Sequence, residues 1–247
     1  MMKIFNYKVI LGIILTLFLV NISYASVEVF SEYNNVLKVN SDNTIEISKN
    51  LTIKNIYDVG IVPGQIEFKV GKGTDGSISN INVRNVKAVD RFGNEIRSQV
   101  RETKDYTIII LDIYYPLLPG FEYKFDLVYT IDYEPGGIFF KSLQIPLRES
   151  TIPIDNGKFS VILPNNYYFT YLSSEGKNAT VEKNIAFWEI KNDVPNSVVF
   201  EYSYLPVKIG SLKGSYVFWI TINFILILFL IQGIRREIKK LRNVHQN

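Results

Sequence analysis

The stretch from Tyr216 to Ile234, YVFWITINFILILFLIQGI, constrains this chain more than any other segment. It contains nineteen residues without a charge, and Arg235 and Arg236 follow it directly. As a helix it would be about 28 Å long, close to the roughly 30 Å hydrocarbon core of a bilayer. We therefore expect a transmembrane helix that leaves the preceding chain on one side of a membrane and residues 235–247 on the other.

The residues that flank this stretch are typical of the two membrane interfaces. Aromatic side chains gather at its start and basic side chains follow its end, a distribution that places the basic end in the cytoplasm. We expect a single-pass protein of the cell membrane with its N-terminal domains outside and a short basic cytoplasmic tail. The predicted interface residues are Tyr216, Trp219, Arg235, Arg236, Lys239 and Lys240.

Residues 1–25 have the features of a secretory signal peptide. Lys3 and Lys8 precede an apolar run over 9–20, and Ser23-Tyr24-Ala25 supplies small residues at the cleavage positions. Cleavage would leave Ser26 as the first mature residue. The alternative is an uncleaved N-terminal anchor, although the apolar run is shorter than a span requires.

The composition excludes several classes of chemistry from the predicted exterior. The chain has no cysteine, and its one histidine, His245, lies in the tail. A Ser-His-Asp triad, a histidine zinc site and a cysteine nucleophile are therefore excluded there, and we predict no catalytic, cofactor or metal site. Of the net charge of +3, the first 25 residues carry +2 and the tail +4, which leaves −3 for residues 26–234. This balance argues against nucleic acid as a partner.

Short segments with alternating apolar and polar residues run from residue 32 to residue 206 and predict an all-β exterior. We expect two antiparallel immunoglobulin-like β-sandwich units, over 26–133 and 134–206, because Glu134-Pro135-Gly136-Gly137 is the best boundary. One continuous sandwich is the alternative. A linker over 207–215 would hold the second unit near the membrane before the helix over 216–234. The predicted strands are 36–39, 44–47 and 51–54 (with a bulge or bend at Lys49-Asn50), 65–70, 83–89, 106–114, 121–129, 138–140, 143–147, 157–163, 167–172, 186–190 and 198–204.

Two groups of residues are candidates for a ligand-binding or catalytic site. Tyr167, Tyr168 and Tyr171 could form an exposed aromatic platform for a glycan, although aromatic residues are also ordinary in strands. A hydrolase without histidine would need two converging carboxylates. The candidates show no spacing that implies convergence, and they are Asp126, Asp132, Glu134, Glu149, Asp155 and Glu189.

Three asparagines are candidates for modification or association. Asn50 and Asn178 each begin an acceptor sequon for glycosylation, and Asn178 follows a predicted loop. Asn223 lies within the predicted span, where an amide hydrogen bond to another helix typically contributes about 0.6–2 kcal/mol. The alternative is that Thr221, water or the helix backbone satisfies the Asn223 amide.

The stretch Asp42–Asn55, DNTIEISKNLTIKN, and the Leu118-Pro119-Gly120 lead-in resemble β-sandwich ectodomains of archaeal surface proteins. The plan of signal peptide, two β domains, one span and short basic tail is similar to ribophorin I, a non-catalytic subunit of the oligosaccharyltransferase. This resemblance implies a scaffold that binds a protein partner in the membrane or envelope. We therefore expect a non-enzymatic type I membrane protein that contacts the lipid bilayer. It would be a surface or complex-scaffolding component whose β ectodomain binds a protein partner close to the membrane, and a glycan- or ligand-binding cell-surface receptor is the alternative.

Overall fold

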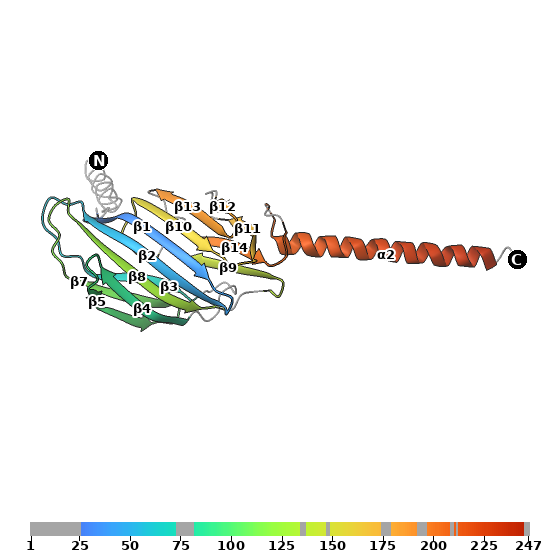
Figure 1. Cartoon of the computed structure of the whole chain (residues 1–247), viewed down its shortest axis with the longest axis horizontal. Helices are drawn as coiled ribbons and strands as arrows, with labels where there is room; N and C mark the ends of the chain where they lie inside the picture. The colour runs from blue at the N-terminus through green and yellow to red at the C-terminus, as the bar shows by residue number, and fades with distance from the viewer. Residues whose placement is uncertain are drawn as a thin grey trace, which may run out of the picture.

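The computed structural model describes residues 26–72, 82–133, 137–146, 149–173, 179–191, 197–207, 210 and 212–244. The described chain is mostly β-strand and ends in one long helix that projects from the end of the β domain (Figure 1). The predicted signal peptide lies outside the described residues, as do 134–136 of the predicted domain boundary.

The strands form one large sheet and two small ones. The large sheet has the order β12-β13-β10-β1-β2-β8-β4-β5. One small sheet has the order β3-β7-β6 and the other β11-β14-β9. The bounds are β1 (Glu28–Val39), β2 (Thr44–Asn55), β3 (Gly64–Gly71), β4 (Asn82–Asp90), β5 (Glu95–Ile96), β6 (Ser98–Glu102), β7 (Tyr106–Ile113), β8 (Glu122–Asp132), β9 (Phe140–Pro146), β10 (Asn156–Ile162), β11 (Tyr168–Ser173), β12 (Thr180–Glu182), β13 (Ile185–Lys191), β14 (Ser197–Ser203) and α2 (Gly214–Val244).

The large sheet crosses the predicted boundary between two β units. β1 pairs in parallel with β10, with Tyr33 opposite Gly157 and Lys38 opposite Ile162. Strands from 26–133 and from 134–206 therefore share one sheet, which is the arrangement of the single-domain alternative. The parallel pairing also differs from the fully antiparallel prediction. Parallel strands need a long connection between them, and the chain from β2 to β9 supplies it.

Alternation along β2 explains why the large sheet has one buried face and one wetter face. Ile45, Ile47, Leu51 and Ile53 are buried, whereas Glu46 on the opposite face is exposed. A period of two places successive side chains on opposite faces of the sheet, as the sequence predicted. The predicted bulge at Lys49-Asn50 is wrong, because β2 pairs with both neighbours in unbroken register there. The irregularity lies in β1 instead.

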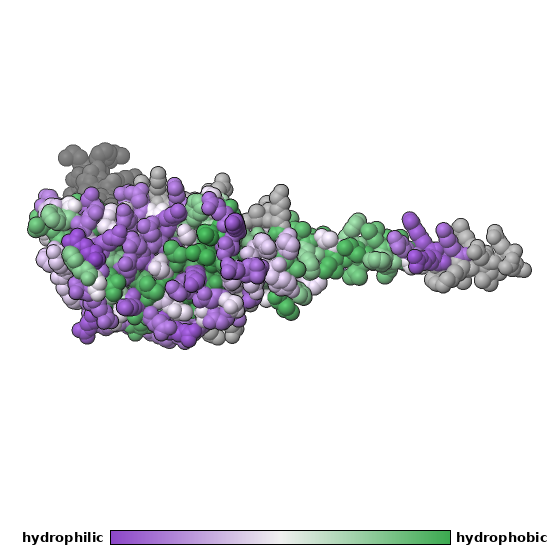
Figure 2. All heavy atoms as spheres, viewed as in Figure 1, coloured by the Kyte–Doolittle hydropathy of each residue, from purple (hydrophilic) through white to green (hydrophobic). Residues whose placement is uncertain are grey.

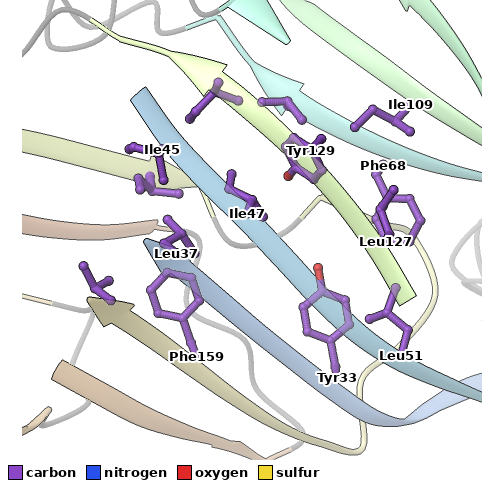
Figure 3. Packing of buried hydrophobic residues seen from close by; sticks show 14 of the residues in the cluster. Tyr33, Leu37, Ile45, Ile47, Leu51, Phe68, Ile109, Leu127, Tyr129 and Phe159 are labelled. Atoms are coloured by element: carbon purple, nitrogen blue, oxygen red, sulfur yellow. The ribbon is translucent and has the colours of Figure 1, made fainter. Parts of the chain in front are cut away.

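Both small sheets contribute to the core on the buried face. Phe68 of β3 packs against Phe30 of β1, with ring centroids 6.3 Å apart, and the Tyr202 hydroxyl of β14 bonds that of Tyr133. Figure 3 shows side chains from β1, β2, β3, β7, β8 and β10 meeting in this one cluster. A single core therefore joins all three sheets.

The helix α2 confirms the predicted apolar segment and is longer. Residues Gly214–Arg236 are long and apolar enough to cross a membrane, and beyond its first turns, which contact the β domain, the described part of this stretch is almost entirely exposed. The helix begins at Gly214, so the last two residues of the predicted linker are helical. It continues to Val244, beyond the predicted span, as one helix.

Candidate functional site

The end of the β domain opposite α2 is formed by the loops 56–63 and 114–121. The first loop follows β2 and the second precedes β8, and these two strands are antiparallel neighbours. The other end of β2 approaches the helix side, since Tyr133 and Lys141 both bond Asn43 in the turn before β2. β2 has twelve residues, so its ends are about 36–40 Å apart at about 3.3 Å per residue. Both loops are therefore distal to the predicted membrane (Figure 1).

The buried side chain of Asn55 holds the two distal loops together. Its Nδ2 donates to the carbonyls of Val59 at 2.8 Å and Leu117 at 2.9 Å, and its Oδ1 accepts from the Tyr57 amide at 2.8 Å. Ile61 and Leu117 also exchange two backbone hydrogen bonds. Because Asn55 is completely buried and satisfied by backbone groups, the loops have a defined shape.

The distal loops present a dense set of exposed apolar side chains. Each is between 52% and 63% exposed, and Asp58 is the one charged residue within the two loops. Figure 2 shows hydrophobic residues at this end of the molecule. We call this set the distal apolar surface, and its members are Ile56, Tyr57, Val59, Val62, Tyr114, Tyr115, Leu118 and Phe121.

Aromatic packing stiffens part of the distal apolar surface. The Tyr115 ring stacks on Tyr123 of β8, with ring centroids 5.6 Å apart and an interplanar angle of 25°, and Tyr123 packs in turn on the buried Phe125. Exposed apolar clusters of this kind mark binding surfaces on soluble proteins. With one carboxylate and no histidine or cysteine, the surface is suited to binding and has no acid–base pair.

The candidate carboxylates of a hydrolase meet separate partners. Asp126 accepts from Asn50 at 2.6 Å, and Asp132 pairs with Arg84 at 2.8 Å. Glu149 is buried against Lys49, whereas Asp155 is exposed on the way into β10. Glu189 is exposed on β13, and Glu134 lies outside the described residues. Within the described ranges there is no group of three or more His, Cys, Asp or Glu residues able to hold a metal ion.

The pair formed by Lys49 and Glu149 is a polar centre that the sequence did not predict. Lys49 projects from β2 into the core, where its Nζ lies 2.7 Å from Glu149 Oε2 and 3.3 Å from the Tyr33 hydroxyl. The Tyr129 hydroxyl donates to the same carboxylate at 3.3 Å. The hydroxyls of Tyr33 and Tyr129 point into the space between the two rings (Figure 3).

Burial and charge oppose each other at this centre. Burial alone would lower the pKa of the Lys49 ammonium, but Glu149 and Tyr33 together outweigh burial and raise that pKa above its ordinary value. Burial raises the pKa of Tyr33 and, more strongly, of Tyr129. Both tyrosines are therefore neutral at neutral pH. The Tyr33 hydroxyl accepts from Lys49, whereas the Tyr129 hydroxyl donates to Glu149. The pair is enclosed by protein, so we assign it a structural role.

A second buried carboxylate fastens α2 to the β domain. Glu201 of β14 accepts from the Thr170 hydroxyl at 2.8 Å, the Ser215 amide at 3.0 Å and the Ser215 hydroxyl at 2.5 Å. The first amides of a helix have no partner within it, and a negative charge there is favourable. Gly214 approaches so closely that an added Cβ would lie 2.6 Å from the Thr170 Cβ. The helix start is thus docked on β11 and β14.

The predicted aromatic platform is only partly displayed. Tyr168 is 47% exposed on β11, as alternation predicted. Tyr167 packs edge-on against Tyr202, and a register shift between Phe169 and Tyr171 changes the alternation beyond that point. None of these three predicted platform tyrosines stacks on another, so they do not form a coplanar strip.

The asparagine predictions have different outcomes. Asn50 is half-buried on the central strand β2, with its amide donated to Asp126, so the folded domain does not present it freely. Asn178 lies outside the described residues, and its glycosylation stays a prediction, tested by a mass shift that Asn178→Gln removes. Asn223 donates its amide to the Trp219 carbonyl at 2.9 Å, within its own helix. Its association with another helix stays a prediction, tested by whether Asn223→Leu dissolves a detergent-resistant complex.

The predicted interface residues lie on α2 in the expected order. Tyr216 and Trp219 are exposed within its first two turns, at 59% and 53%. Arg235, Arg236 and Lys239 are exposed after the apolar stretch, and Lys240 follows in the same helix. The helix therefore has an aromatic end beside the β domain and a basic end away from it.

Comparison with known proteins does not identify a function. No family model matches this chain. A stretch of 133 residues, 53% of this chain and 92% of the other, is 29% identical to an uncharacterized protein of Methanocaldococcus jannaschii. A crystal structure of a candidate nutrient-binding protein from Legionella pneumophila matches with a TM-score of 0.49 at 10% identity, over 72% of this chain and 67% of that one.

Two further solved structures have the same level of likeness. An M1 zinc metallopeptidase from Deinococcus radiodurans matches with a TM-score of 0.41 at 12% identity, over 72% of this chain and 43% of that one. Yeast LTA4 hydrolase in complex with bestatin matches with a TM-score of 0.44 at 11% identity, over 76% of this chain and 29% of that one. This chain therefore spans less than half of either structure, and neither likeness assigns it an activity.

The sequence interpretation missed the distal apolar surface. It used Leu118-Pro119-Gly120 as part of a family resemblance and gave residues 56–63 no functional role. The available signal was that 56–63 and 114–121, both rich in aromatic and aliphatic residues, contain only Asp58 as a charge. Their proximity depends on the pairing of β2 with β8 and on Asn55, which no local pattern reveals.

Proposed function

We propose that this protein is a non-enzymatic, single-pass membrane protein whose β domain binds a protein partner through the distal apolar surface. The observation that carries this proposal is the group of eight exposed apolar side chains on two loops that Asn55 joins by hydrogen bonds. Exposed side chains of this size cost solubility unless a partner covers them. Tyrosine and phenylalanine are also enriched at the centres of protein interfaces.

If α2 spans the membrane, the protein would hold the distal apolar surface at a fixed distance from the bilayer. In the proposal α2 spans the cell membrane, with the β domain outside and Arg235 and Arg236 at the cytoplasmic face. The Glu201 contacts with Ser215 support a defined orientation of the β domain on its helix. The binding surface would then face away from the membrane, which differs from the sequence-based expectation of a partner close to the bilayer, and the partner could be an envelope protein or a soluble one.

The scaffold role agrees with the two resemblances noted in the sequence. A non-catalytic complex subunit with the plan of ribophorin I needs a folded exterior, a span and a binding surface, and all three are part of this proposal. The matched protein of Methanocaldococcus jannaschii comes from an archaeon, in line with an archaeal type of surface protein. We also retain an immunoglobulin-like β-sandwich architecture as a proposal, and the sharing of one core by the three sheets supports it.

A glycan is the second candidate ligand, favoured by the stacked rings of Tyr115 and Tyr123. Carbohydrate sites combine an aromatic platform with polar side chains that bond the sugar hydroxyls. The distal loops offer Asp58 and tyrosine hydroxyls, but aliphatic residues such as Val59 and Leu118 dominate their surface. The surface therefore suits an apolar protein face better than a sugar.

Site-specific photo-crosslinking in the native membrane tests the proposal. A photoreactive phenylalanine at Tyr115 and another at Leu118 should each give the same discrete protein adduct. The control position is Val181, which is exposed on the edge strand β12, and it should not give that adduct. The charge variant Phe121→Asp should abolish the adduct, and Val181→Asp should leave it unchanged.

The outcome separates protein binding from the alternatives. Equal thermal midpoints of Phe121→Asp and Val181→Asp would show that the loss is not due to unfolding. A glycan ligand would show as retention on a glycan array that Phe121→Asp removes, without a protein adduct. Identical adducts at Tyr115 and Val181, or an adduct that survives Phe121→Asp, would refute a partner site on the distal loops.

A further inference from the structure

Large apolar side chains are also exposed at the opposite end of the β domain, where α2 emerges. We call four of them the proximal collar: Ile138 (86% exposed), Phe139 (41%), Tyr204 (48%) and Leu212 (59%). Ile138 is more exposed than any other large apolar residue in the described part of the chain. Figure 2 shows hydrophobic residues beside the start of α2. An isoleucine so fully exposed to water is unfavourable without a cover.

The collar is held against the first turns of α2. The Phe139 ring centroid lies 6.4 Å from Tyr204 and 6.3 Å from Phe218 of the helix, and Phe140 lies 5.4 Å from Phe218. The Ser203 hydroxyl donates to the Phe139 carbonyl at 2.7 Å. The segment that carries Ile138 and Phe139 is therefore fixed at the level of Phe218 along the helix.

The length of the apolar stretch sets the depth of Phe218. If Arg235 marks the inner edge of a hydrocarbon core about 30 Å thick, the outer edge lies about twenty residues earlier, near Ser215, at 1.5 Å per residue. If the basic side chains extend toward the headgroups and Lys239 marks the edge, the outer edge lies near Trp219. Both placements put Phe218 at the outer boundary of the core or within it.

We propose that the proximal collar is a lipid-contacting surface, so that the β domain rests in the outer leaflet and not above it. The occupant is the bilayer, because the collar packs on Phe218 and is continuous with the apolar stretch of α2. Aromatic residues such as Phe139 and Tyr204 favour the headgroup level, and Ile138 would enter the acyl region. This inference rests on the membrane placement of α2 and is independent of the partner at the distal end.

Depth-dependent quenching on the full chain tests the collar. The chain contains no cysteine, so a single introduced cysteine can carry one environment-sensitive fluorophore. The test variant is Ile138→Cys. Phe92→Cys is the control for a label in water, because Phe92 is 72% exposed in the turn after β4. Phe229→Cys on α2 is the control for a label inside the membrane. Each protein is labelled in detergent, reconstituted into phosphatidylcholine vesicles, and exposed to lipid-borne nitroxide or aqueous iodide.

The expected result is that the Ile138 label is quenched several-fold more by shallow lipid nitroxide than the Phe92 label, and several-fold less by iodide. The Phe229 label should respond most strongly to deep nitroxide. If Phe229 is quenched by lipid nitroxide while Ile138 behaves like Phe92, α2 spans the bilayer and the collar proposal is refuted. If Phe229 is open to iodide, the membrane placement and the collar proposal both fail, whereas crosslinking at the distal loops is tested separately.

Discussion

Replacing Lys49 by methionine should strongly destabilise the β domain, because it would leave Glu149 buried without its counter-charge. The two groups are 2.7 Å apart, and their side chains are 0% and 2% exposed. After the change, the carboxylate would keep only the Tyr129 hydroxyl as a side-chain partner among the residues described. Breaking a buried pair from one side typically costs about 3–5 kcal/mol. At about 2–4 °C per kcal/mol for a domain of this size, the thermal midpoint should fall by about 6–20 °C.

Thermal unfolding of the full chain in mild detergent, followed by the fluorescence of the buried Trp188 and by near-ultraviolet circular dichroism, measures the effect. The matched control is Lys54→Met on the same strand. Lys54 pairs with Glu122 at 3.9 Å with both side chains more than 40% exposed, so its loss should cost about 0–1 kcal/mol.

The double variant Lys49→Met/Glu149→Leu gives the decisive comparison. Removing both charges should recover most of the lost stability, since apolar replacements of a buried ion pair are often neutral or stabilising. If Lys49→Met lowers the midpoint no more than Lys54→Met, or if the two single effects simply add, the reasoning about an interdependent buried pair is wrong.

Three further predictions concern other buried polar groups. Burial raises the pKa of Tyr133 to about 12, so the folded state retains a proton that the unfolded state releases near pH 10. The contribution of Tyr133 to stability should be fully present below about pH 10 and be lost, by roughly 3 kcal/mol, as the pH rises toward 12, in addition to the losses from the other buried tyrosines. Tyr133→Phe should make the decline in stability between pH 9 and 11 smaller in unfolding experiments. Glu201→Ala should increase protease cleavage between the β domain and α2 several-fold, because the carboxylate that accepts hydrogen bonds from the Ser215 amide and hydroxyl is lost. Unchanged cleavage would contradict a fixed junction. Asn55→Ala should cost about 2–4 kcal/mol by leaving buried loop carbonyls without donors, and it should weaken partner crosslinking at the distal loops; normal stability would show that water replaces the amide.

Local patterns in the sequence predicted most of the strands and the helix. The alternation in β8 and β10 and the apolar run of β7 correspond closely to the observed elements, because side chains of a strand alternate between a buried and a wet face. The short edge strands β5, β6 and β12 were missed. β6 and β12 are exposed along nearly their whole length, and β5 has only two residues, so none of them carries a pattern of burial.

The candidate sites were less accessible from the sequence. Lys49 follows the alternation of β2 and lies on its buried face. The sequence interpretation instead assigned Lys49 to a bulge or bend. Glu149 comes from a segment 100 residues later, and only the packing shows that it neutralises this lysine. The Glu201 contact with Ser215 similarly joins a strand to a helix across the predicted linker.

The sequence by itself determined the apolar helix with its aromatic and basic ends, the β character of the chain before that helix, and the absence of cysteine and histidine before residue 245. These properties depend on composition and on periods of a few residues, which are local. Only the tertiary structure decided that β1 pairs with β10, that Asn55 joins two distant loops into one apolar surface, and that a collar at the other end adjoins the helix. Each of these depends on pairing between segments far apart in the chain, where the free energy of one shared core selects an arrangement that no single segment specifies.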